Sequence, residues 1–151
     1  DVIIKGGNAL DKNGTVGVLL GDQKMGGTIG SLYGIIRAKG IDLVLPVGLE
    51  KLIWGDLQAT AQLAGSDFCK FSMGMSCGLF PVHGIVITEI DALEMLFDVE
   101  VFHMASGGLG RAQGSITLLV EADEPEELNL CKQYIENQIL GEAEFKPHLP
   151  M

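Results

Sequence analysis

The sequence predicts an α/β protein, with a Rossmann-like, mostly parallel sheet followed by a ferredoxin-like β-α-β-β-α unit. Short apolar runs alternate with loops and one helical pattern up to residue 47, and after residue 83 the order changes to strand, helix, strand, strand, helix. A length of 151 residues with 47% apolar side chains suits one domain or two small ones. We expect a ligand-binding half at residues 1–65, a covering loop at 66–83, the ferredoxin-like half at 84–140 and an extended tail at 141–151.

In the first half, residues 2–5 and 16–20 are apolar runs typical of buried strands, and residues 8–14 between them are rich in turn formers. Apolar residues recur at helical spacing over 29–39, and Gly40 follows as a helix-ending glycine. A continuous apolar run at 41–47 then predicts a strand covered on both faces. The helix between two strands is a crossover typical of parallel sheets.

The rest of the chain contains a short helix, a long loop and the second unit. Asp56 is a candidate cap for a helix over residues 56–63. Residues 66–83 lack a clean period, and loops of this length are more often functional or mobile than idle. The second unit is predicted as a strand at 84–88, a helix at 89–97, strands at 100–105 and 115–122, and a helix at 125–140.

Charge and composition exclude several classes of function. A net charge of −10 argues against binding of nucleic acid, and no apolar stretch is long enough for a membrane span. Residues 121–144 carry eight acidic side chains and one lysine, which indicates a solvated helix face or an acidic docking surface for a partner. No signal peptide is recognisable, so the cysteines, Cys69, Cys77 and Cys131, are expected to be reduced, inert thiols in the cytoplasm.

The chain begins at Asp1 rather than at a methionine and enters an apolar strand at once. From this we expect a fragment, a processed product or an incompletely traced terminus.

A glycine-rich loop that opens the first helix is a candidate anion site, because helix N-termini present free amides and a positive dipole end. Glycines allow close approach of backbone to a ligand, and threonine or serine adds hydroxyl donors. The candidate ligand-binding residues here are Gly26, Gly27, Thr28, Gly30 and Ser31. The alternative interpretation is a set of tight turns needed for packing, since the spacing fits neither a Walker A loop nor a dinucleotide fingerprint.

Other binding candidates are polar residues in two further glycine loops. Lys5, Gly6 and Asn8 follow the first strand, where a lysine could hold a phosphate or carboxylate, although it could equally be a solvated charge. Arg111 lies in the loop Ser106-Gly107-Gly108-Leu109-Gly110-Arg111 and could clamp an anion with two hydrogen bonds, or be exposed at a hairpin tip.

The candidate catalytic residues are Glu50, Glu89 and His83. Glu50, followed by Lys51, comes directly after a buried strand, at the end where open α/β sheets place their ligands. Glu89 ends another strand, so two carboxylates could face one pocket, although a lone glutamate there is more often a cap or a surface residue. His83 is a possible base in the covering loop, whereas His103 in an apolar strand reads as structural. No zinc or iron cluster is visible, and no metal or cofactor is predicted.

Residues 2–47 resemble one segment of the sugar-phosphate isomerase and translation-initiation-factor-2B-like proteins, within the group of ribose-5-phosphate isomerase, glucosamine-6-phosphate deaminase and coenzyme A transferases. The matching pieces are the strand at 2–4, Gly6-Gly7-Asn8-Ala9-Leu10, Asn13-Gly14, the strand at 16–20, and Gly27-Thr28 opening a helix before a strand. Asn8 stands where the isomerases carry an aspartate, and an amide is neither an acid nor a base. The resemblance therefore implies the fold and an anion pocket more than isomerase activity. The whole chain also looks like a prokaryotic family without an assigned activity.

The sequence therefore predicts a cytoplasmic protein that binds a small anionic metabolite, a sugar phosphate or a carboxylate, with isomerase-like or transferase-like catalysis as an extension. The alternative is a noncatalytic sensor or oligomeric assembly module, in which the β-α-β-β-α half binds a partner or a second copy by extending a sheet edge. We expect a homo-oligomer in either case, with no nucleic-acid or membrane partner.

Overall fold

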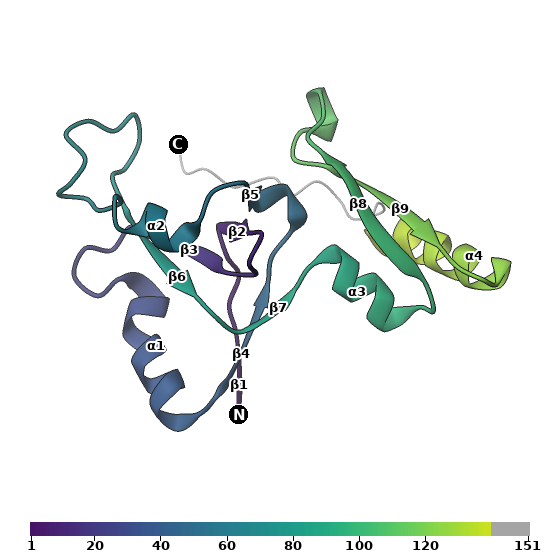
Figure 1. Ribbon diagram of the computed structural model, residues 1–151, viewed down its shortest axis with the longest axis horizontal. Helices are drawn as coiled ribbons and strands as arrows, with labels where there is room; N and C mark the ends of the chain where they lie inside the picture. The colour runs from purple at the N-terminus through teal and green to yellow at the C-terminus, as the bar shows by residue number, and fades with distance from the viewer. Residues whose placement is uncertain (140–151) are drawn as a thin grey trace, which may run out of the picture. The chain divides into compact units, whose positions relative to one another are not determined.

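The computed structural model describes residues 1–139, with every side chain except that of Arg111, and shows a mixed α/β chain (Figure 1). It divides into two compact units. The first contains residues 1–89 and 105–116, and the second contains residues 90–104 and 117 onward. The predicted tail at 141–151 lies outside the described residues.

A parallel three-stranded sheet forms the centre of the first unit. Its order is β1 (Val2–Ile4), β4 (Asp42–Pro46) and β7 (Ile85–Ile87), with Ile3 opposite Leu43 and Leu45 opposite Val86. Leu43 and Leu45 in the central strand are buried. The strands predicted at 2–5, 41–47 and 84–88 are confirmed.

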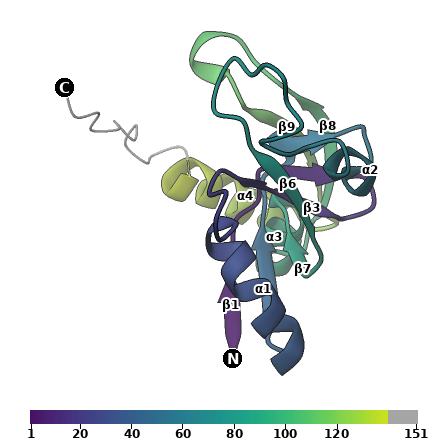
Figure 2. The same ribbon diagram turned by 90° about the vertical axis from the view of Figure 1, so that its left-hand side faces the viewer.

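Helix α1 (Gly27–Lys39) leads into the central strand β4 and runs opposite to β1 and β4 (Figures 1 and 2). Ile29 and Ile36, two turns apart, are buried in the core. The helix ends at Gly40, whose φ of 63° is the left-handed conformation of a helix-ending glycine. Because α1 runs against the strands, its N-terminus lies at the end of the unit where the parallel strands have their carboxyl ends.

A second sheet of the first unit mixes parallel and antiparallel pairs. Its order is β5 (Leu52–Ile53), β2 (Ala9–Asp11), β3 (Val16–Leu20) and β6 (Gly78–Val82). Strand β3 is antiparallel to both neighbours, whereas β2 and β5 are parallel.

Two predictions therefore need correction: residues 9–11 of the expected turn and residues 78–82 of the expected covering loop are strands. Strand β6 was not predicted because it contains Gly78 and Pro81, which are uncommon inside strands. It is an edge strand, however, and a proline is tolerated there. The first unit consequently has one parallel sheet and one mixed sheet, rather than a single mostly parallel one.

Helix α2 (Leu57–Ala61) begins at the predicted cap, because the Asp56 carboxylate accepts a hydrogen bond from the Ala59 amide at 2.9 Å. We expect Asp56→Ala to lower the free energy of unfolding by about 1 kcal/mol, the usual contribution of such a cap. Urea denaturation measures this change, with the exposed Asp67→Ala as the control. A change no larger than that of the control would contradict a capping role.

The second unit contains two helices and a two-stranded sheet: α3 (Glu89–Leu96), β8 (Glu100–Ser106), β9 (Ile116–Glu121) and α4 (Pro125–Tyr134), which continues as a π-helical turn, Ile135–Ile139. Its core gathers Leu93, Val99, Val101 and Cys131. The strand at 84–88, predicted to belong to a ferredoxin-like sheet, is β7, which pairs with β4 in the first unit. The ferredoxin-like arrangement is therefore not observed.

The two units differ completely in charge. The first carries eight acidic and eight basic side chains, whereas the second carries twelve acidic side chains and two lysines. The whole net charge of −10 thus belongs to the second unit.

Among residues 1–139, no helix combines the length and apolar character that crossing a bilayer requires.

Candidate functional site

Three loops of the first unit leave the carboxyl ends of three neighbouring parallel strands. Residues 5–8 follow β1, residues 47–51 follow β4, and Thr88 and Glu89 follow β7. Open α/β sheets bind their ligands at this edge, because the loops there converge while helices and strands hold them in place. Of the predicted site residues, Lys5, Gly6, Asn8, Glu50 and Glu89 all lie in these loops. We call this region the carboxyl edge.

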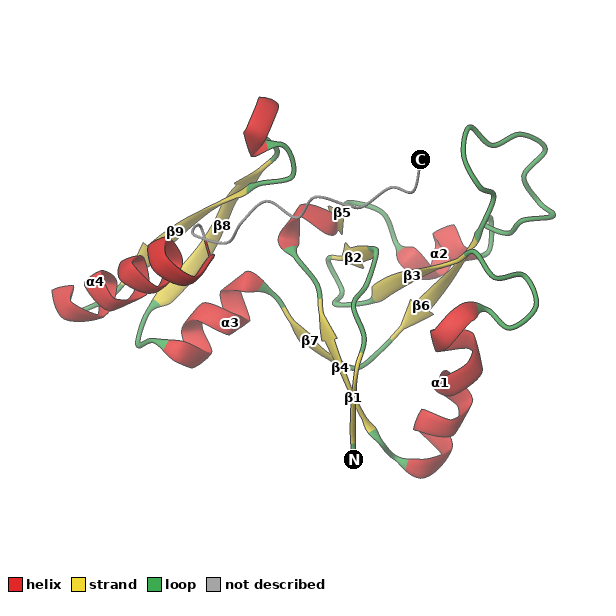
Figure 3. Cartoon of the chain, turned by 180° about the vertical axis from the view of Figure 1, so that it is seen from behind, coloured by secondary structure: helices red, strands yellow, loops and turns green. Residues whose placement is uncertain are grey.

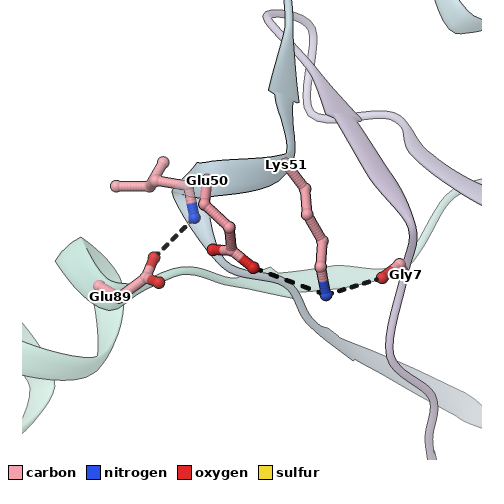
Figure 4. A network of polar contacts seen from close by, with 5 residues as sticks. Gly7, Glu50, Lys51 and Glu89 are labelled. Carbon is pink, nitrogen blue, oxygen red and sulfur yellow. Dashed lines mark hydrogen bonds and ion pairs between the residues drawn. The ribbon is translucent and has the colours of Figure 1, made fainter. Parts of the chain in front are cut away.

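Glu89 connects the loop after β7 to the loop after β4. Its Oε2 accepts a hydrogen bond from the Leu49 amide at 2.8 Å (Figure 4). Leu49 begins the 3₁₀ turn Leu49–Lys51, and its side chain is only 6% exposed. The turn is therefore held by the hydrogen bond of the Leu49 amide and by the burial of the Leu49 side chain. Glu89 therefore holds in place the turn that presents Glu50 and Lys51.

Lys51 connects the loops after β4 and β1. Its Nζ donates to the Gly7 carbonyl at 3.1 Å and lies 3.8 Å from Glu50 Oε1 (Figure 4). The side chains of Lys51 and Glu50 are 40% and 33% exposed, so solvent and small molecules reach both groups. A carboxylate beside an ammonium, open on one side, can accept a proton while the cation binds a nearby negative charge.

Gly48 gives the Glu50 side chain its position. A Cβ at residue 48 would collide with the Glu50 carboxylate, which folds back over the backbone at that point. A larger residue at position 48 would therefore displace the flexible end of the Glu50 side chain rather than the backbone.

Lys5 and Asn8 complete the loop after β1. Lys5 Nζ donates to the Gly6 carbonyl at 2.8 Å, and its amide donates to Val44. Asn8 Oδ1 accepts the Leu19 amide at 3.0 Å, which ties the loop to β3. The Asn8 side chain therefore has a structural partner, whereas the Lys5 ammonium, with three donors, keeps capacity for a ligand.

The glycine loop before α1 contains a carboxylate that the sequence analysis overlooked. Asp22 accepts the amides of Lys24 at 3.0 Å and Met25 at 3.4 Å. These hydrogen bonds, with a smaller contribution from the Gly27 amide, lower the pKa of Asp22. Asp22 thus binds amides just before the predicted ligand-binding residues and reaches only Gly27 among them.

The predicted binding residues in this loop have conformational roles as well. Gly26 and Gly27 have φ angles of 67° and 63°, and a Cβ at Gly30 would collide with the Met25 carbonyl. Ser31 Oγ donates to the Gly27 carbonyl at 2.9 Å, and Thr28 is exposed. The turn geometry alone therefore accounts for the three glycines, the alternative that the sequence left open.

Among the described side chains, that of His83 is not brought to the carboxyl edge by any contact that the structure shows. His83 precedes β7 and so lies at the amino end of the strand that Glu89 follows; its ring is 3.2 Å from Gln58 Nε2. Arg111 lies in the 3₁₀ turn Gly110–Ala112 between β8 and β9, and its side chain lies outside the described ones.

Asp11, within the turn-forming residues 8–14, is a buried carboxylate. It is 2% exposed and accepts the amides of Asn13, Thr15 and Leu57 at 2.9, 3.0 and 3.2 Å. Burial acts to raise the pKa of Asp11, but these amides outweigh it, so the pKa lies below its usual value. The signal in the sequence was an aspartate two residues before Asn13-Gly14, a pattern typical of a side chain that closes a turn.

The second unit has an acidic cavity of about 480 Å³ bordered by β8, β9 and the start of α4. Its acidic lining residues are Asp98, Glu100, Glu121, Asp123, Glu124 and Glu127. This is the place where the acidic docking surface considered from the sequence would lie. Over residues 1–139 no cluster of histidine, cysteine and carboxylate side chains is arranged to hold a metal ion.

We compared the chain with known family models, with characterised proteins and with solved structures. None of the three comparisons found a match.

Proposed function

We propose that this protein binds a small anionic metabolite, a sugar phosphate or a carboxylate, at the carboxyl edge of the β1-β4-β7 sheet. The observation that carries the proposal is the connected group of Glu89, Leu49, Glu50, Lys51 and Gly7, which joins the loops of three adjacent parallel strands. Lys51 and Lys5 supply positive charge, and their ammonium groups have donors to spare for a negatively charged ligand.

The same group supports an enzyme of the isomerase or transferase type. Glu50 is the carboxylate that a ligand can reach, and its Oε1 lies 3.8 Å from Lys51 Nζ. In this role Glu50 is the general base and Glu89 positions the turn that carries it. The resemblance of residues 2–47 to the sugar-phosphate isomerase group agrees with this ligand class. The thiols of Cys69, Cys77 and Cys131 are all free, which suits a reducing cytoplasm.

A thermal-shift screen with sugar phosphates, small carboxylates and acyl-coenzyme A compounds tests the proposal. We expect a ligand to raise the melting temperature of the wild-type chain, and Lys51→Met or Lys5→Met to weaken its binding about tenfold or more, as the loss of a charge-assisted hydrogen bond does. Lys39→Met at the far end of α1 removes the same charge and should leave binding unchanged. Equal binding by all four proteins would contradict a site at the carboxyl edge.

The second candidate is an assembly module that uses the second unit. One face of β8 and β9 exposes Phe102, Met104 and Leu119, while the alternate residues Val101 and Val120 belong to the core of the unit. Contiguous exposed apolar side chains often mark contact surfaces, and a second copy of the chain would cover this one. No response to any compound in the screen, together with a tight oligomer in sedimentation velocity, would favour this function over the first.

A further inference from the structure

The loop between α2 and β6 exposes an unusual number of large apolar side chains. Residues 66–77, which we call the apolar loop, form most of the long connection between α2 and β6 (Figure 3). Within it, Phe68, Phe71, Met73 and Met75 are 74%, 82%, 97% and 76% exposed. Single exposed apolar residues are ordinary, but four within eight positions of one long loop suggest a surface that becomes covered.

The apolar loop ends beside the carboxyl edge. Gly78, the first residue of β6, is paired with Leu20, the last residue of β3. The preceding residue Leu19 donates its amide to Asn8, next to the Gly7 carbonyl that holds Lys51. The thioether of Met75 lies against Gly21, where a Cβ would not fit beside it. One end of the apolar loop is therefore anchored one strand away from the loop that carries Lys5, Gly7 and Asn8.

We propose that the apolar loop is a lid that closes over the carboxyl edge when the anionic ligand binds, which rests on the function proposed above. Closure would bury Phe68, Phe71 and Met73 over the ligand. At roughly 3.3 Å per extended residue, a twelve-residue segment fixed at both ends reaches about 20 Å from its anchors, enough to cross the two strands that separate it from Lys51.

The local backbone and the chemistry of the site both suit such a movement. Hydrogen bonds from Phe68 and Cys69 to the Gly65 carbonyl hold the first turn of the loop, and Gly74 has open space around it, as a pivot needs. Apolar groups over a half-exposed carboxylate and ammonium exclude water, which strengthens the interaction of both with the ligand.

The chain contains its own reporters of closure. Cys69 is exposed within the loop, whereas Cys131 is 2% exposed in the second unit. Maleimide modification of Cys69 is measured with inorganic phosphate and with the compound that gives the largest thermal shift. A ligand that keeps the lid closed for about four-fifths of the time slows modification about fivefold. Trypsin cleavage after Lys70 should slow in parallel, and Cys131 should stay unmodified throughout, which shows that the chain remains folded.

A double variant tests the role of the apolar side chains. Phe71→Ser with Met73→Ser should weaken binding of the same compound and remove the protection of Cys69, because the closed lid loses its apolar contacts. Leu109→Ser, at a position 92% exposed outside the loop, is the matched control and should leave both unchanged. All three positions are exposed, so the folded state should tolerate the substitutions.

The outcomes of these experiments distinguish a failure of the proposed lid from a failure of the proposed binding site. Ligand binding that depends on Lys51 but leaves Cys69 and Lys70 equally reactive would overturn the lid and leave the proposed function standing. The absence of any thermal shift would overturn both. Protection that survives in the double variant would show that the loop closes without these side chains, against the inference.

Discussion

Replacing Asp11 by asparagine is expected to lower the free energy of unfolding by about 2–4 kcal/mol, since it weakens three hydrogen bonds to one buried charge. Asn13, Thr15 and Leu57 all donate their amides to this carboxylate. An asparagine oxygen can still accept from Asn13 and Thr15 on the Oδ1 side, but its amino group would face the Leu57 amide, donor against donor. Asp11 joins the β2-β3 turn to the start of α2. Weakening its hydrogen bonds therefore destabilises a tertiary contact as well as the turn.

The same contacts predict how stability depends on pH. The pKa of Asp11 is lowered in the folded chain from its ordinary 3.8, so its stabilising contribution is complete above that value and is lost as pH falls through the lower folded pKa. The asparagine variant does not titrate there, and its stability should approach that of the wild type in acid. Urea titrations across the acid range measure both curves.

Asp42→Asn provides the control, because Asp42 is exposed at the start of β4 and the substitution removes the same charge. Parallel curves for the wild type and the Asp11 variant over the whole acid range, or a loss equal to that of the control, would show that Asp11 is not the group responsible.

Glu50→Gln is expected to slow proton transfer by about 10²- to 10⁴-fold, the usual contribution of a positioned general base, while leaving binding of the anion nearly intact. The amide keeps the size of the side chain but no longer accepts a proton at neutral pH. Exchange of a substrate hydrogen with deuterated water, followed by NMR on the compound found in the thermal screen, measures the step directly.

Gly48→Ala tests the proposed role of Glu50 as general base by displacing its side chain instead of replacing its carboxylate. A methyl group at residue 48 would force the Glu50 carboxylate away from its place, and a flexible side chain can move without unfolding the turn. We expect a loss of rate comparable to that of the glutamine variant, with a small change in stability. Glu121→Gln on the exposed face of β9 is the control for the change of charge. Full activity in both the Glu50 and the Gly48 variant would show that Glu50 is not the general base.

Much of the secondary structure could be read from the sequence because its signals are local. Gly40 ends α1 through its own backbone conformation, Asp56 caps α2 within three residues, and the apolar run at 41–47 needs two covered faces wherever it lies. The position of Glu50 and Glu89 at strand ends was also readable, because the carboxyl end of a strand is defined by the chain itself.

The errors concern pairings between distant residues. Strand β6 contains Gly78 and Pro81 and becomes a strand only by pairing with β3 as an edge. Strand β7 looks the same whether it joins β4 or β8, and its partner is set by packing. In the site, Lys51 was predictable together with Glu50 as an acid or base candidate at a strand end, whereas its contact with Gly7, 44 residues away in the chain, was not. The hydrogen bonds of Asp22 to the Lys24 and Met25 amides depend on the fold of the loop before α1 rather than on residue type.

The unequal division of charge has a consequence for how a ligand arrives. The first unit, which carries the carboxyl edge, is electrically balanced, and the second bears the entire excess of negative charge. An anion of the kind proposed above would meet no long-range attraction from the unit that binds it. Its capture would then rely on short-range contact with individual lysines, and added salt would remove no steering from that unit.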